Sequence, residues 1–229
     1  MNLPLERLVP WTLARSIWAS QFQLLKGHDL ANSLLPRICS EKTISFGQSG
    51  LAFKDNSLVK AAKKGFAIPQ LSKFLRSPFT STAALRLVIK VGQIHQNGWR
   101  KPGNAKVLLS AALEATVTYM NFHPGCVDLF VDHPNSSIGV GSEKEGVFMT
   151  ICRINSQPWA LEHKAIKKQS TATLIFSSDQ AACFSAVGNL DHMLAAGDGQ
   201  IQLRGQIPLL EKFGYASRVV RRELPSQHE

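Results

Sequence analysis

The sequence lacks the short motifs that accompany the common catalytic sites. It contains no His-Glu-x-x-His zinc motif and no Gly-x-Ser-x-Gly nucleophile motif. The glycine-rich run Gly139–Lys144 has neither the Gly-Lys-Ser/Thr ending of a phosphate loop nor the strand-to-helix setting of a dinucleotide site. We therefore predict no catalytic residues, no cofactor and a protein that is not an enzyme.

Paired cysteines and long apolar runs are missing as well. The four cysteines, Cys39, Cys126, Cys152 and Cys183, are widely separated and form no Cys-x-x-Cys pair, so we expect reduced thiols and no metal site. No apolar run reaches the roughly 20 residues needed to cross a bilayer, and the first residues do not resemble a secretory signal. These absences predict a cytoplasmic protein, or one bound peripherally to a membrane.

Acidic residues are scarce in the first half of the chain. Residues 1–105 contain 15 lysines and arginines but only 4 acidic residues, whereas residues 106–229 contain 11 and 12. The basic half predicts contact with a polyanion. An anionic membrane surface is one such partner, and the candidate docking residues are Trp11, Trp18, Lys60, Lys63, Lys64, Lys73 and Arg76. Nucleic acid is the alternative partner, although no recognised binding motif accompanies the basic residues; a solvated lysine-rich surface is a third interpretation.

Helical periodicity dominates residues 1–104. Apolar residues recur at helical spacing over Leu5–Leu25 and Ser81–Ile94, while Thr43–Phe46 and Leu51–Phe53 are typical of a small hairpin. The polar, turn-rich segment 96–104 is the clearest break in the chain. We therefore predict a basic, mainly helical region over residues 1–104 and a second domain over residues 105–229.

The sequence pattern of the second domain predicts an α+β fold. After a helix over Ala105–Met120, β-type patterns cover five short segments: Val127–Val131, Ser137–Val140, Val147–Ile154, Trp159–Ile166 and Ala172–Phe176. Two short apolar helices, Asp179–Val187 and Asn189–Ala196, precede a strand over Gln200–Gly205 and a helix from Pro208. Because consecutive strands with short turns pair antiparallel, we expect a mostly antiparallel sheet.

This order of elements resembles the lipid-transfer domain of sterol carrier protein 2. The resemblance rests on the strands Val147–Ile154 and Trp159–Ile166, the two apolar helices divided by Gly188, and the Gly-Asp-Gly-Gln-Ile-Gln-Leu-Arg-Gly run at 197–205. It implies a five-stranded sheet covered on one face by helices, with an apolar tunnel between them. It covers residues 105–224, and the first hundred residues have no counterpart in that domain.

Apolar side chains on these elements are the candidate lining of a lipid-binding cavity, because such cavities are lined mainly by hydrophobic residues. The candidates are Phe148, Trp159, Leu174, Phe176, Phe184, Met193, Leu194, Leu209, Leu210 and Phe213. Together with the resemblance, they predict a non-catalytic carrier of a sterol, fatty acyl or isoprenoid lipid. A non-catalytic subunit of a lipid-modifying enzyme complex is the alternative.

Overall fold

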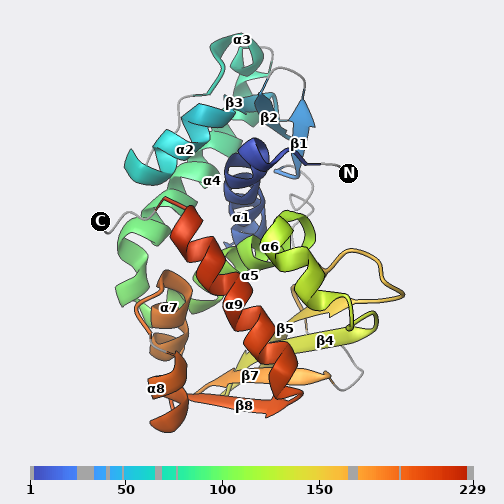
Figure 1. The fold of residues 1–229 in the computed structure, drawn as a ribbon. Coiled ribbons are helices and arrows are strands. Elements are labelled where there is room, and N and C mark those ends of the chain that lie inside the picture. The colour runs from blue at the N-terminus through green and yellow to red at the C-terminus, as the bar shows by residue number, and fades with distance from the viewer. Residues whose placement is uncertain are drawn as a thin grey trace.

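The computed structural model describes residues 3–24, 34–39, 42–47, 49–64, 69–75, 77–164, 170–190 and 192–225. The fold is α+β, as predicted, with a mainly helical N-terminal region followed by a five-stranded sheet and further helices (Figure 1). None of the helices in these segments is long and apolar enough to span a bilayer.

The N-terminal region combines helices with a small three-stranded sheet. Its helices are α1 (Leu8–Leu24), α2 (Asp55–Lys64), α3 (Leu71–Phe74) and α4 (Pro78–Asn97), and its strands are β1 (Pro36–Cys39), β2 (Thr43–Phe46) and β3 (Leu51–Lys54). The predicted hairpin is therefore confirmed as β2 and β3, with β1 added antiparallel to β2. Phe46 and Phe53 meet edge to face at 5.8 Å and fill the core of this region.

The break between residues 96 and 104 folds as two 3₁₀ turns, Gly98–Arg100 and Pro102–Asn104, before α5 (Ala105–Phe122). Pro124 then begins the short helix α6 (Pro124–Val127), and the His123 side chain caps it by accepting the Gly125 N–H at 3.1 Å. A 3₁₀ turn over Asp128–Phe130 follows. The predicted strand Val127–Val131 is therefore wrong, because the proline and the cap favour helical turns over an extended chain.

The five-stranded sheet has the order β6-β5-β4-β7-β8. Its strands are β4 (Ser136–Ser142), β5 (Gly146–Arg153), β6 (Ala160–Glu162), β7 (Ala172–Phe176) and β8 (Ile201–Gly205). The sheet is mixed rather than mostly antiparallel, because β7 pairs parallel with β4. The chain leaves β6 at one edge and returns beside β4, so the rule for consecutive strands with short turns does not apply there.

The strand predicted over Trp159–Ile166 is shorter than expected. Asn121 of α5 holds the backbone of Trp159: its side chain accepts the Trp159 N–H at 2.8 Å and donates to the Trp159 carbonyl at 2.9 Å. Both backbone groups of Trp159 are thus satisfied by a side chain instead of a neighbouring strand. β6 accordingly contains only Ala160–Glu162.

Helices α7 (Asp179–Val187), α8 (His192–Gly197) and α9 (Ile207–Glu223) complete the chain, close to the predicted positions. Ser178 caps α7 by accepting the Ala181 N–H, and Gly188 ends that helix in a left-handed conformation with φ 85°. Pro208 lies in the first turn of α9. Helices α5, α7 and α9 contact the sheet, and Figure 1 shows α9 crossing over α5 towards β8.

The closest association between the two regions is the packing of α1 along α5. Small residues allow this approach: Ser16 donates to the Ala111 carbonyl at 3.1 Å, and Ser20 to the Val107 carbonyl at 3.4 Å. Ala14 and Ala19 of α1 are completely buried. The helical N-terminal region is therefore held against the first helix of the second region rather than joined to it only through residues 96–104.

Candidate ligand-binding cavity

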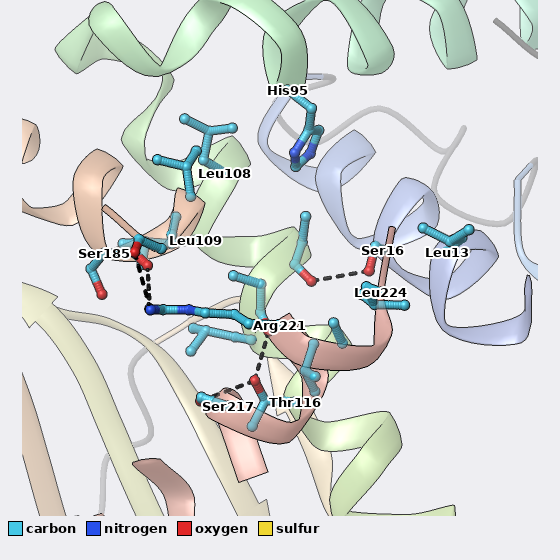
Figure 2. A pocket seen from close by; sticks show the side chains of 18 of the residues that line it. Leu13, Ser16, His95, Leu108, Leu109, Thr116, Ser185, Ser217, Arg221 and Leu224 are labelled. Carbon is cyan, nitrogen blue, oxygen red and sulfur yellow. Dashed lines mark hydrogen bonds between the residues drawn. The ribbon is translucent and has the colours of Figure 1, made fainter. Parts of the chain in front are cut away.

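A cavity of about 930 Å³ lies between the N-terminal region and the C-terminal region. The N-terminal walls come from α1, α2 and α4, and the opposite walls come from α5, α7, α9 and the strands β7 and β8. Figure 2 shows Leu13 and Ser16 of α1, His95 of α4 and Leu108 of α5 around this space. Its volume falls in the range of cavities that hold small organic ligands.

Small residues create the space. Four helices contribute a residue with little or no side chain to the lining: Ala61 on α2, Gly92 on α4, Ala112 on α5 and Gly214 on α9. Because these residues extend little beyond their helices, the helices can stand beside one another without filling the volume between them. Most of the remaining lining is aliphatic, including Leu85, Val88, Leu108, Leu113 and Val220.

Four of the ten predicted lining residues lie on this cavity: Leu174, Phe176, Leu210 and Phe213. The structure thus brings β7 and α9 together as the sequence suggested. These two elements form only one side of the cavity, whose other side comes from the N-terminal region.

The other predicted lining residues lie elsewhere. Phe148 packs against the core with the Lys106 ammonium 5.1 Å from its ring centre, Trp159 contacts Phe130 edge to face at 5.5 Å, and Phe184 lies 5.8 Å from Trp99. Leu209 is fully buried in the core, whereas Leu194 is 68% exposed. The side chain of Met193 lies outside the described residues.

Sequence reasoning missed the contribution of α4. Val88, Val91 and His95 line the cavity and follow helical spacing on one face. The sequence showed that this helix has an apolar face, but it gave no sign that the face would lie opposite α9. The missing information was the packing of α1 on α5, which brings the N-terminal region alongside the sheet domain.

The polar atoms of the lining are largely satisfied within the protein. The Ser16 hydroxyl donates to the Ala111 carbonyl, and the Thr116 and Ser217 hydroxyls are 3.2 Å apart (Figure 2). Burial lowers the pKa of His95 to about 4, so this imidazole is neutral at physiological pH. Apart from Glu211, Arg218 and Arg221 of α9, the lining therefore carries no charged side chain.

A buried ion pair lies in the α1–α5 interface beside the cavity. The Arg15 Nε donates to the Glu114 Oε1 at 2.6 Å, and the side chain of Glu114 is 1% exposed. Burial raises the pKa of Glu114, and the charge of Arg15 opposes that effect. The Glu114 Oε2 finds no hydrogen-bond partner among the described residues, so the carboxylate depends on Arg15.

The predicted membrane-docking residues do not form one exposed surface. Trp11 is only 8% exposed, and Trp18 is half-buried with its ring 5.0 Å from that of Phe22. Lys60 is exposed and Lys73 is half-buried. The side chains of Lys63 and Lys64, and the whole of Arg76, lie outside the described residues.

Exposed apolar side chains are found instead around α3 and the start of α4. Leu71 is 69% exposed, Leu75 is 66% exposed and Phe79 is 91% exposed. Figure 1 shows α3 at the end of the molecule farthest from the five-stranded sheet. We call Leu71, Leu75 and Phe79 the α3 tip.

Comparison with known proteins adds little. No family model matches the chain, and no curated protein matches its sequence. Among solved structures, a double mutant of the sec-alkyl sulfatase PisA1 is similar to 68% of this chain, with 10% identity and a TM-score of 0.31. This chain spans 31% of that protein's length. A likeness of that size supports no conclusion about fold or function.

Proposed function

We propose that this protein is a non-catalytic lipid-binding protein that holds an apolar ligand in the cavity between its two regions. The observation that carries this proposal is the cavity itself, with a volume of about 930 Å³ and walls that are mainly aliphatic. A lipid chain in this space would leave water and gain packing contacts with the aliphatic walls. The neutral His95 and the internally bonded hydroxyls present little that would recognise a polar substrate.

The resemblance to the sterol carrier domain is part of the proposal. Four strands, two short helices, a fifth strand and a longer closing helix are present in this order, and β7 and α9 supply part of the lining. A sterol, a fatty acyl chain and an isoprenoid chain all match the apolar walls. The N-terminal region then serves to close the cavity on the side that the carrier domain alone would leave open.

Lipid extracted from the purified protein tests this function. Native mass spectrometry is expected to show a bound apolar molecule, and organic extraction is expected to release a sterol, fatty acyl or isoprenoid compound. A fluorescent fatty acid or sterol analogue should bind the delipidated protein at one site. If no lipid copurifies and no analogue from the three classes binds at micromolar concentration, the proposed function is wrong.

Docking on an anionic membrane is a second proposed property, and the α3 tip favours it. Three large apolar side chains are exposed close together in sequence, and Lys60 and Lys73 belong to the same basic region. Burying each of these apolar side chains in a membrane interface contributes roughly 1.5–3 kcal/mol, and nearby lysines add attraction to anionic headgroups. A carrier needs such contact to load or release its lipid.

The triple variant L71S/L75S/F79S replaces the α3 tip with serine. Its affinity for phosphatidylserine-containing vesicles, measured by co-sedimentation, should be at least about tenfold lower than that of the wild type. Ile154, which is 63% exposed on the other region, provides the matched control I154S, and this variant should bind vesicles normally. Wild-type protein should bind phosphatidylcholine vesicles more weakly. Unchanged sedimentation of the triple variant would exclude the α3 tip as the docking site.

A further inference from the structure

Two arginines of α9 lie where the cavity meets solvent. Arg218 and Arg221 both line the cavity, and both are exposed. They are three positions apart on one helix, so their side chains leave from the same face. The interior of the cavity is apolar, and these residues therefore give one part of its rim a concentrated positive charge.

Arg221 is held in place by the end of α7. Its Nη1 donates to the Gly188 carbonyl at 3.3 Å and its Nη2 donates to the Ser185 carbonyl at 3.0 Å (Figure 2). The side chain lies across Gly188, where a Cβ atom would come within 3.2 Å of the Arg221 Cδ. Gly188 has φ 85°, so glycine suits both the backbone and the close approach of the arginine.

The charge of these arginines is not neutralised within the described part of the chain. Neither guanidinium forms an ion pair there, although Glu211 also lines the cavity on α9. Partial burial of the Arg221 guanidinium, and to a lesser extent the neighbouring charge of Arg218, lower the pKa of Arg221. Arg221 uses two of its five N–H donors on carbonyls, so donors remain for a ligand.

We propose that Arg218 and Arg221 bind the anionic headgroup of a long-chain lipid whose tail occupies the cavity. The proposal rests on the proposed function, because it assigns the head of the same ligand. A carboxylate or a phosphate monoester matches the fork of a guanidinium and would relieve the repulsion between the two cations. A neutral headgroup would receive neither benefit, so the site selects charged lipids over sterols and alcohols of similar length.

Three ligands with the same hexadecyl chain length test the assignment at pH 7.5: palmitic acid, hexadecyl phosphate and hexadecanol. The wild-type protein should bind at least one anion about tenfold or more tightly than hexadecanol. The better of the two anions identifies the head as carboxylate or phosphate. In the R218Q/R221Q variant the anions should bind only as tightly as hexadecanol, whose own affinity should not change.

Two further variants keep the test decisive. Arg222 lies on α9 but not on the cavity, so R222Q removes one positive charge, as R218Q does, and should preserve the preference for anions. R218Q alone removes a side chain without hydrogen bonds to the described residues, so it should weaken anion binding without loosening α7. Equal wild-type binding of all three ligands would overturn the headgroup site and leave the cavity function standing. Binding of none of them would also overturn the headgroup site, and the cavity function would fall with it only if sterol and isoprenoid analogues fail to bind as well.

Discussion

Replacing Ala112 with tryptophan should strongly weaken lipid binding while the protein remains folded. Ala112 lies on α5 and lines the cavity. An indole at this position would extend into the space that we assign to the lipid chain, so ligand and side chain would compete for the same volume. Because the space is already open, the substitution should avoid the 1–3 kcal/mol that overpacking of a filled core costs. Affinity for a fluorescent fatty acid should fall by at least about tenfold.

The A83W variant provides the control for this experiment. Ala83 is an exposed residue of α4 that does not line the cavity, so tryptophan there adds the same surface without entering the space. A83W should bind ligand normally. Thermal unfolding distinguishes the outcomes further, because a bound lipid should raise the Tm of A83W and not that of A112W. Normal binding by a folded A112W would place the ligand outside this cavity.

The elements of the second region could be predicted from the sequence because their signals are local. The β-branched and aromatic residues of β5, the alternation of apolar and polar residues in β8, the Ser178 cap and Gly188 at the end of α7 all act within a few residues. The strand predictions were wrong where contacts with other residues outweigh the local pattern. Val127–Val131 contains β-branched residues, but Pro124 and the His123 cap begin a helical turn ahead of it. Asn121, distant in sequence, removes Trp159 from β6.

The sheet order and the N-terminal wall of the cavity could not be predicted, because both depend on long-range packing. The parallel pairing of β4 with β7 requires the chain to cross between sheet edges, and no turn sequence encodes that choice. The cavity needs α4 and α9 to face each other across α5, which follows from serine and alanine contacts between α1 and α5. Apolar residues in the sequence look the same whether they fill a core or line a space.

The α1–α5 contact also predicts the largest change in stability. Replacing Arg15 with methionine should lower the free energy of unfolding by about 3 kcal/mol at pH 8, because it leaves the Glu114 carboxylate buried without its cation. This loss lies at the lower end of the range for breaking a buried ion pair, because the side chain of Arg15 is 25% exposed. Urea unfolding at several pH values measures the effect.

The loss should shrink as the pH falls. In the folded protein the pKa of Glu114 lies above its ordinary value of 4.5, so the folded protein holds this proton more tightly than the unfolded chain does. The contribution of this group to stability is therefore present in full below pH 4.5. Stability from this group is lost as the pH rises through the raised pKa, and removing Arg15 raises that pKa further. The R15M variant should therefore approach the wild type near pH 4.5, apart from about 0.5–1 kcal/mol for the lost contact between Arg15 and the Trp18 ring.

The double variant R15M/E114L separates the charge from the packing. With both partners replaced by apolar side chains no buried charge remains, so stability at pH 8 should return to within about 1 kcal/mol of the wild type. The pH dependence attributed to Glu114 should disappear as well. If the double variant is as unstable as R15M, or if the R15M loss is equal at pH 5 and pH 8, packing rather than the Arg15–Glu114 charge pair holds α1 against α5.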